Sequence, residues 1–298
     1  MVIKHIVIAG GGPAGFITYG VLKHLSQEKF WSINNIESLY GTSIGAFFST
    51  VVCLDYKWNI LDDYFIERPW DKLIEITPQS IINVFISSGA VDPNIFAERA
   101  LEPLLTAKGL DKDTTLKDFY DFCGIDLHIF ATEINSQKLQ KVDLSHTTHP
   151  DWKLTESVAM SIAYPLFFKP ICKEDKCYID GGLINHYPIK DCIEQKKCEK
   201  EEILGIKNIW LNEKSESIVQ KNSSITEFIS VLLKKMRDEI DPREDVSQVK
   251  NTVRCTCENI SGFDKWLNVL SNKDMRTNLI SSGINQAKLF LQYIKSSD

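Results

Sequence analysis

The 298-residue chain is predicted to fold as an α/β protein whose central sheet is mostly parallel. Three observations support this prediction. Short apolar runs rich in β-branched residues alternate with helical patterns, as in strands that are buried on both faces. Glycine clusters stand directly after the first two runs. The composition, with 43% hydrophobic and 25% charged residues, is that of a globular protein and excludes disordered, collagen-like and coiled-coil chains.

The expected strands and helices alternate in an order that places helices on both faces of the sheet. The strands are expected at residues 2–9, 36–40, 127–132, 177–179 and 203–211. After the first strand, apolar residues recur at helical spacing and are expected to face the sheet; they are Ile17, Val21, Leu22 and Leu25. The helix after the second strand, residues 44–54, is apolar almost all round, and we therefore expect it to be buried.

The segment 55–120 interrupts this alternation and is predicted to be a helical insertion. Its aromatic side chains stand among charges and turns, and they are Trp58, Tyr64, Phe65, Trp70, Phe85, Phe96, Phe119 and Tyr120. Two interpretations are open for them. They form either ordinary core packing or the lid or wall of a pocket.

The last part of the chain, residues 213–298, is predicted to be a helical extension packed on the α/β domain of residues 1–212. It begins with a polar stretch and then shows two amphipathic helical patterns, at residues 225–240 and 284–294. Such helices either pack on their own domain or dock on a membrane or a partner. No composition shift divides the chain into independent units.

Charge and hydropathy exclude several classes of function. The net charge is −6, and without a long basic run a nucleic-acid surface is not expected. No apolar stretch approaches the roughly 18–20 residues that span a bilayer, and the N-terminus lacks the pattern of a secretory signal. The expected location is therefore cytoplasmic. The eight cysteines lack zinc spacing and are expected to be reduced thiols, including Cys172, Cys177, Cys255 and Cys257.

The first glycine cluster has two interpretations. Gly10, Gly11, Gly12 and Gly15 lie between an expected strand and an expected helix, where free backbone N–H groups attract an anion. As G-x-G-x-x-G this cluster also matches a dinucleotide-binding fingerprint, which would make the protein an FAD- or NAD-dependent oxidoreductase. Glu37 stands near the distance expected for a ribose-binding acid, but at the beginning or middle of its strand rather than at its end.

The second cluster is typical of a nucleophile elbow. Gly41, Ser43 and Gly45 form G-x-S-x-G between the second expected strand and the buried helix. The flanking glycines allow strand and helix to approach, and the serine hydroxyl projects at the N-terminus of the helix, where an oxyanion is favoured. A glycine loop beside this serine can supply the oxyanion hole, so acyl hydrolysis explains both clusters.

The serine needs a base, and two candidates follow the fourth expected strand. Asp180 stands directly before Gly181 and Gly182, on a rigid turn from which a carboxylate can reach a neighbouring strand end. His186, six residues later, is the alternative, as part of a Ser–His–Asp set. His146 and His149 lie in a polar loop and are expected to be solvated.

Taken together, these motifs resemble the patatin-like phospholipases. The resemblance covers about residues 3–190: IVIAGGGPAGFITYGVLKHL resembles the first strand, loop and helix of that family, GTSIG its elbow and DGGLINHYP its aspartate turn. A fourth stretch, SIAYPLFF at residues 161–168, is similar to the SxAxPxxF segment that precedes that turn. The family fold is a three-layer α/β/α sandwich.

The resemblance implies a lipid acyl hydrolase that acts through a dyad. Ser43 would be the nucleophile and Asp180 the proton acceptor, and the oxyanion hole would be formed by backbone N–H groups of Gly10, Gly11, Gly12 and Ile44. No cofactor or metal is expected. The partner is a lipid ester, reached through transient peripheral contact with a membrane by local aromatic side chains or the C-terminal helices. Ala14 stands where many relatives carry Lys or Arg.

Three classes of function therefore remain at this point. The first is the lipid acyl hydrolase, or an acyltransferase with the same dyad. The second is the FAD- or NAD-dependent oxidoreductase. The third is a lipid-binding protein that keeps the fold without turnover, an idea that only Ala14 favours.

Overall fold

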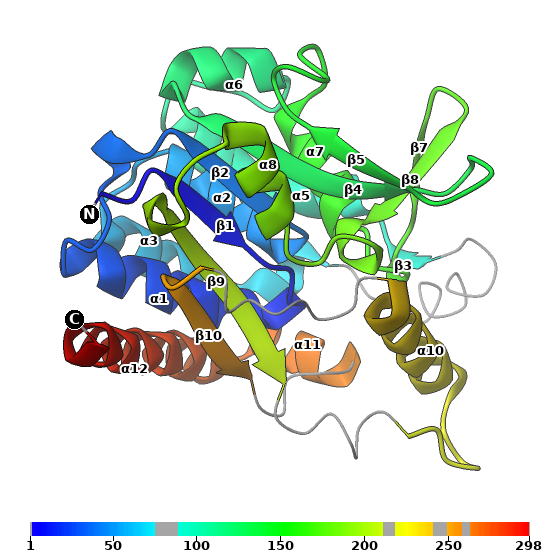
Figure 1. The fold of residues 1–298 in the computed structure, drawn as a ribbon. Coiled ribbons are helices and arrows are strands. Elements are labelled where there is room, and N and C mark those ends of the chain that lie inside the picture. Colours follow the sequence, from blue (N-terminus) through cyan, green and yellow to red (C-terminus); the bar gives the residue numbers. More distant parts are fainter. Residues whose placement is uncertain (1, 75–88, 211–217, 241–248, 258–262, 298) are drawn as a thin grey trace.

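The central element of the computed structural model is an eight-stranded sheet in the order β10-β9-β1-β2-β4-β8-β7, with β5 paired to β4. The structure describes residues 2–74, 89–210, 218–240, 249–257 and 263–297 (Figure 1). The strands of this sheet are β1 (His5–Ile8), β2 (Ser38–Thr42), β4 (Asp126–Glu133), β5 (Gln140–Leu144), β7 (Ile171–Lys173), β8 (Lys176–Asp180), β9 (Ile203–Trp210) and β10 (Thr252–Cys257). β3 (Gly89–Val91) and β6 (Leu166–Phe168) form a separate pair.

Helices cover both faces of the sheet, and the expected three-layer α/β/α sandwich is confirmed. The helices are α1 (Gly15–Gln27), α2 (Ile44–Cys53), α3 (Trp58–Glu67), α5 (Pro93–Thr106), α6 (Leu116–Cys123), α7 (Leu154–Ile162), α8 (Ile189–Lys196), α10 (Ile225–Ile240), α11 (Phe263–Ser271) and α12 (Lys273–Ser297). None of the helices in the described ranges is long and apolar enough to cross a membrane.

Alternation along the strands explains how both faces are buried. In β1, Ile6 and Ile8 join the large core under α1 and α2, whereas Val7 joins a smaller core under α8. In β2, Leu39 belongs to the large core and Tyr40 to the smaller one. A parallel strand that is apolar on both sides is stable only between two layers of helices. The expected strands are therefore confirmed, except that Leu211 lies outside the described residues.

The insertion of residues 55–120 is largely helical in its described part, as expected. It comprises α3, a short 3-10 turn at Trp70–Leu73, the strand β3, α5 and α6. Its aromatic side chains take part in both expected roles. Phe65 stacks on Trp70 with ring centroids 5.8 Å apart and lies deep in the core, and both rings also line a pocket described below. Phe85 lies outside the described residues.

The C-terminal region differs from the expected helical extension. Residues 252–257 form β10, which pairs in parallel with β9 at the edge of the sheet. Its alternating pattern buries Val253, Cys255 and Cys257, so the C-x-C spacing belongs to a strand. The expected domain boundary at 212/213 lies outside the described residues. β10 is an edge strand of the central sheet, so the C-terminal region contributes to the same sheet as residues 1–212.

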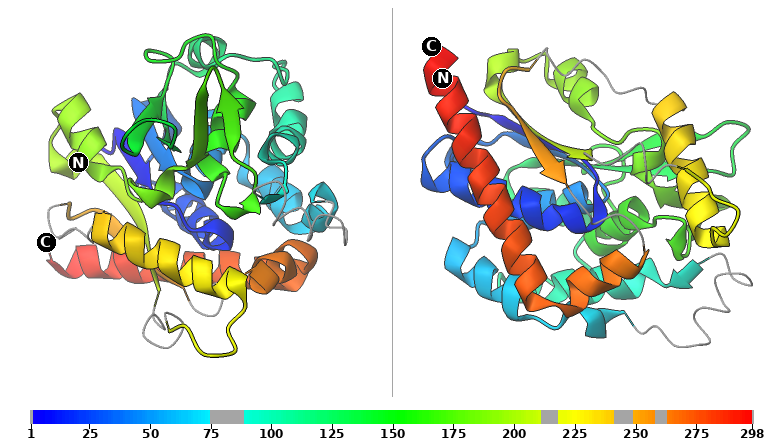
Figure 2. Two further views of the ribbon diagram at one scale, coloured as in Figure 1. Left: turned by 90° about the vertical axis from the view of Figure 1, so that its right-hand side faces the viewer. Right: turned by 90° about the horizontal axis from the view of Figure 1, so that it is seen from below.

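α12 packs along α1 on the same side of the sheet (Figures 1 and 2). The two helices cross closely because each has a glycine at the contact. A Cβ atom on Gly20 would lie 2.2 Å from the carbonyl oxygen of Ile280, and one on Gly283 would lie 2.0 Å from that of Ile17. α12 is therefore an integral layer of the fold.

The expectation of reduced cysteines is wrong for one pair. Cys172 and Cys177 face each other across the antiparallel β7–β8 hairpin and form a disulfide. The physical reason is register: the hairpin turn brings their Cα atoms to 4.0 Å. Spacing along the chain could not reveal that the two residues are cross-strand partners.

Candidate active site

Two strands meet end to end along β4, and their meeting point positions the candidate site. β2 pairs with the first part of β4, so that Thr42 lies opposite Phe130. β8 runs in the opposite direction beside the last part of β4, so that Asp180 lies opposite Ala131. β5 occupies the other edge of β4 at residues 129–133. The C-terminal ends of β2 and β8 therefore abut, which brings Ser43 and Asp180 together.

Ser43 occupies a strained turn between β2 and α2, as the elbow motif predicts. Its φ of 56° and ψ of −127° are unusual for a residue with a side chain. The flanking glycines are required by close approach. A Cβ on Gly41 would lie 2.5 Å from the carbonyl oxygen of Gly45, and one on Gly45 would lie 2.4 Å from that of Ile8. Such strain is found where a fixed geometry serves function.

The hydroxyl of Ser43 donates a hydrogen bond to Asp180 Oδ2 at 2.6 Å. The other carboxylate oxygen, Oδ1, accepts the backbone N–H of Gly182 at 2.7 Å. Burial raises the pKa of Asp180 to about 6, although the bonds from Ser43 and Gly182 and the charge of Arg237 lower it. A carboxylate with a raised pKa is a stronger base, which is what an alcohol nucleophile requires.

Ser161, in the SxAxPxxF segment, holds the backbone of the elbow in place through two hydrogen bonds. Its hydroxyl accepts the backbone N–H of Ser43 at 2.8 Å and donates to the carbonyl oxygen of Phe130 at 2.5 Å. Two residues later, the carbonyl oxygen of Ala163 accepts the backbone N–H of Asp180 at 3.0 Å. One segment therefore supports the backbone of both Ser43 and Asp180.

The glycine loop is held on both sides beside Ser43. The N–H of Gly10 donates to the carbonyl oxygen of His186 at 3.0 Å, and the carbonyl oxygen of Gly10 accepts Asn208 Nδ2 at 2.9 Å. The amide of Gly10, expected in the oxyanion hole, is thus already committed. Within the described ranges, the N–H groups of Gly11, Gly12 and Ile44 have no acceptor, which leaves them as the candidate donors.

A mostly apolar pocket opens beside the serine. Ser43, Gly12 and Ile44 line it together with side chains from α1, α2, β6, the insertion and the C-terminal region. These further lining side chains include Phe16, Phe47, Phe48, Phe65, Trp70, Phe96, Phe167, Phe168, Trp266 and Leu270. Such a pocket suits a long apolar group next to Ser43.

Trp266 lies directly over the glycine loop. Gly12 has a φ of +51°, and a Cβ atom there would lie 2.5 Å from the indole ring of Trp266. Glu37 is exposed and precedes β2, at the end of that strand away from Ser43. An indole against the loop and an acid at the wrong end of the strand disfavour a dinucleotide site.

His186 borders the loop, and the serine hydroxyl donates its hydrogen bond to Asp180. A Cβ on Gly10 would lie 3.3 Å from Ser43 Cβ and 3.5 Å from His186 Nε2, so the ring is close to the site. The geometry therefore favours Asp180 as the base. Ala14 is fully buried, next to the loop.

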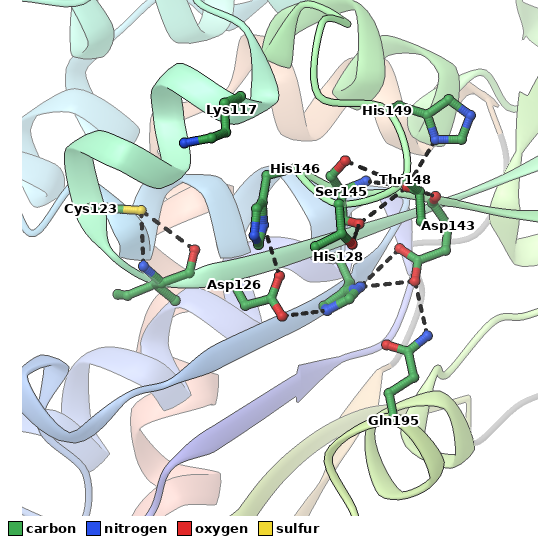
Figure 3. Close-up of polar contacts among 12 residues, drawn as sticks. Lys117, Cys123, Asp126, His128, Asp143, Ser145, His146, Thr148, His149 and Gln195 are labelled. Carbon is green, nitrogen blue, oxygen red and sulfur yellow. Dashed lines mark hydrogen bonds and ion pairs between the residues drawn. The ribbon is translucent and has the colours of Figure 1, made fainter.

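The histidine loop differs from the expected solvated loop (Figure 3). His146 is half-buried, stacks on Tyr120 with ring centroids 3.7 Å apart and places Nδ1 3.1 Å from Asp126 Oδ1. His149 is also half-buried, with Nδ1 2.9 Å from Thr148 Oγ1. The physical reason is that the loop folds back over the beginning of β4, where it meets a carboxylate.

The carboxylate belongs to a polar cluster around His128, at the end of β4 away from Ser43 (Figure 3). His128 Nδ1 lies 2.9 Å from Asp143 Oδ2, and Nε2 lies 3.1 Å from Asp126 Oδ2. Burial opposes protonation of His128, but Asp126 and Asp143 prevail and raise its pKa to about 9. No group of three or more His, Cys, Asp or Glu in the described part of the chain is arranged to hold a metal ion.

Several residues of the site were not singled out from the sequence. Asn208, near the end of β9, and Trp266, in α11, meet the glycine loop from about 200 and 250 positions away along the chain. No local pattern marks such residues, because their role depends on strand order. Thr132 was likewise not indicated by the sequence; its Oγ1 donates to the carbonyl oxygen of Asp180 at 3.0 Å.

Comparison with known proteins adds a family and several relatives. The family model of patatin-like phospholipases matches residues 6–193, more than half of the chain. Uncharacterized protein R571 of Acanthamoeba polyphaga mimivirus is 27% identical over 187 residues, which cover 63% of this chain and 60% of that protein. Probable lipid hydrolase 463L of Invertebrate iridescent virus 6 is 27% identical over 206 residues, which cover 66% of this chain and 67% of that protein.

Among solved structures, VipD from Legionella pneumophila has a similar fold. The TM-score is 0.56 at 15% sequence identity, and the match covers 98% of this chain and 67% of VipD. The likeness therefore extends over the C-terminal region as well as the part that the family model matches.

Proposed function

The chain belongs to the patatin-like phospholipase family, and on that premise we propose that it is a serine lipid acyl hydrolase that acts through Ser43 and Asp180. The observation that carries the proposal is the 2.6 Å hydrogen bond from the strained, buried serine to a buried carboxylate. The name of the iridescent-virus relative, a probable lipid hydrolase, supports the same class of reaction.

The proposed reaction has two steps that share one base. Asp180 takes the proton of Ser43 as Oγ attacks the ester carbonyl, and the N–H groups of Gly11, Gly12 and Ile44 stabilise the oxyanion. The C–O bond breaks and the leaving alcohol takes the proton from Asp180. Water, activated by Asp180, then cleaves the acyl-enzyme and releases the fatty acid and the free serine. The apolar pocket would hold the acyl chain.

The proposal is tested by labelling with a fluorophosphonate probe followed by peptide mapping. We expect labelling at Ser43, and its loss in Ser43→Ala and in Asp180→Asn. Ser49→Ala is the matched control, because Ser49 is buried in α2 with no hydrogen-bond partner for its hydroxyl within the described residues. Circular dichroism verifies that each variant is folded.

Two results would contradict the proposal. A folded wild-type protein that does not label would favour a lipid-binding protein without turnover. Full labelling of Asp180→Asn would exclude Asp180 as the base and return attention to His186.

A further inference from the structure

α10 is an amphipathic helix whose apolar face points away from the protein. Large apolar side chains recur every three or four residues on one side of the helix, and each is 42–52% exposed. We call this row the α10 stripe; it consists of Ile225, Phe228, Leu232, Met236 and Ile240. A helix that only packs on its own domain would bury such a row.

The opposite face of α10 is polar and points toward the protein. Ser230, Lys234 and Arg237 lie on that side and are half-buried. Arg237 is close enough to Asp180 and Tyr164 for its charge to lower the pKa of both groups against the effect of burial. Arg237 itself pairs with its neighbour Asp238, with Nη2 2.7 Å from Oδ1. The helix therefore places a positive charge near the catalytic aspartate, and its apolar stripe is exposed in the described structure.

The position of α10 links the stripe to the proposed active site. The helix packs against the turn Gly181–Leu183, which directly follows Asp180. It lies beyond the C-terminal ends of the sheet strands, on the side of the molecule away from both chain ends (Figures 1 and 2). The pocket that holds Ser43 opens at the same edge of the sheet.

We propose that the α10 stripe docks the molecule on a phospholipid bilayer, with the edge of the sheet that carries Ser43 turned toward the membrane. The inference rests on the proposed function, because an acyl hydrolase with an apolar pocket must meet its substrate at a lipid surface. The stripe is one helix wide and about 24 Å long, as in helices that lie in the bilayer interface. The helix that carries it packs against the turn directly after Asp180, so the stripe lies near the edge of the sheet that carries Ser43.

The charge of α10 indicates how it would bind. Lys234, Lys235 and Arg237 are balanced by Glu227, Asp238 and Glu239, so the helix is neutral in a chain of net charge −6. Attraction to anionic lipid is therefore small, and apolar insertion must supply the affinity. Zwitterionic vesicles should be sufficient, with little dependence on salt.

α12 offers no comparable surface, although the sequence also indicated it for docking. Its inner face packs on α1, and its exposed large apolar side chains among the described residues are Leu289 and Tyr293. The C-terminal part of α12, to which both belong, lies on the opposite side of the molecule from α10 (Figure 1). They provide a matched control.

The test is flotation of the full chain with phosphatidylcholine vesicles, in a Ser43→Ala background that prevents hydrolysis. We expect Ser43→Ala to float, and the added pair Phe228→Glu and Leu232→Glu to weaken binding at least about tenfold. Phe228→Leu with Leu232→Met should float like the parent. Leu289→Glu with Tyr293→Glu, which adds the same charge elsewhere, should also float like the parent.

Several outcomes would overturn the proposal. They are no flotation of the parent, equal flotation of the glutamate pair on α10, or equal loss in the α12 control. A dimer in size-exclusion chromatography that the α10 glutamates convert to monomer would instead assign the stripe to a second copy of the chain.

Failure of the proposed function is measured separately, with a soluble short-chain ester. Wild-type protein that floats but does not hydrolyse the ester would retain the docking surface and lose the catalytic proposal. Wild-type protein that hydrolyses the ester but does not float would retain the catalytic proposal and lose the docking surface. In the active background, the α10 glutamates should leave hydrolysis of the soluble ester unchanged and lower hydrolysis of vesicle phospholipid.

Discussion

Asp180 must lose its proton before it can accept one from Ser43, so its pKa sets the lower end of the pH range in which the protein is active. Burial raises that pKa to about 6, and the bonds from Ser43 and Gly182 only partly offset the effect. We therefore expect kcat/KM for a soluble short-chain ester to rise with pH through an apparent pKa near 6 and then level off. The measurement is a pH–rate profile between about pH 4.5 and 8.

Arg237 provides the control for this profile. Its positive charge lowers the pKa of Asp180, so Arg237→Gln should move the rising limb to higher pH. A profile that is flat through pH 6, or that Arg237→Gln moves to lower pH, would show that another group titrates.

Ser161 is expected to act on the rate through the position of Ser43. Ser161→Ala would leave the buried N–H of Ser43 without its acceptor and the carbonyl oxygen of Phe130 without its donor. We expect a loss of stability of about 1–3 kcal/mol and a fall in kcat of at least about tenfold, because the strained elbow relaxes. Thermal unfolding and steady-state kinetics measure the two effects.

Ser157→Ala is the matched control for Ser161→Ala. Ser157 is buried in the same helix, but its hydroxyl donates to the carbonyl oxygen of Lys153, within that helix. Its replacement should leave kcat unchanged. Equal kinetic losses in both variants would mean that α7 acts through general stability and that Ser161 has no special role.

At the scale of elements, local patterns were sufficient where strand, turn and helix are adjacent in the chain. The strand ending at Thr42, the elbow at Ser43 and the buried α2 form one continuous segment, so their order alone indicates the geometry. β10 was missed because it is short and half polar, although the alternation in TVRCTC carries the signal of an edge strand. The Cys172–Cys177 disulfide depends on hairpin register, which composition does not contain.

The same limit applies to the candidate site. Ser43 and Asp180 each stand in a local motif, so both were indicated. That they touch follows from β2 and β8 meeting end to end along β4, which is a property of strand order. Asn208 and Trp266 have no local motif at all.

The beginning of β4 is stabilised by the charged cluster around His128, and the sign of its pH dependence follows from the pKa. A histidine whose pKa is raised to about 9 stabilises the fold fully below about pH 6.5, and the contribution is lost as the pH rises through 9. His128→Gln should therefore destabilise the protein by about 1–3 kcal/mol at pH 6 and by progressively less toward pH 9. Urea unfolding at several pH values measures the difference.

His5 is the control, because its shift has the opposite sign. Burial lowers the pKa of His5, whose Nδ1 lies 2.7 Å from Ser38 Oγ. The destabilisation caused by His5→Gln should therefore shrink as the pH falls below about 6.5. Parallel pH trends in the two variants would contradict this account of the His128 cluster.

At the scale of the whole molecule, the C-terminal region is part of the core. β10 completes the sheet, α11 contributes Trp266 to the pocket, and α12 covers α1. Removal of residues 213–298 would therefore expose the edge of β9 and one face of α1, and would not isolate a docking function. Point substitutions in α10 are the better test of membrane contact.

Arg276 connects this region to the insertion, and its loss should weaken the molecule as a unit. Its buried guanidinium donates to the carbonyl oxygens of Phe65, Ile66 and Arg68 near α3, and to those of Val269 and Leu270 in α11. Arg276→Ala leaves several of these acceptors unpaired, at a cost of about 2–4 kcal/mol. Lys273→Ala is the control, because the Lys273–Glu67 ion pair joins the same two regions but is exposed and contributes little.

Calorimetry should show a single transition for wild type and for Arg276→Ala, with a lower Tm in the variant, since the C-terminal region and the α/β sandwich share one core. A separate low-temperature transition in Arg276→Ala would mean that the C-terminal region unfolds on its own, and would contradict the single shared core.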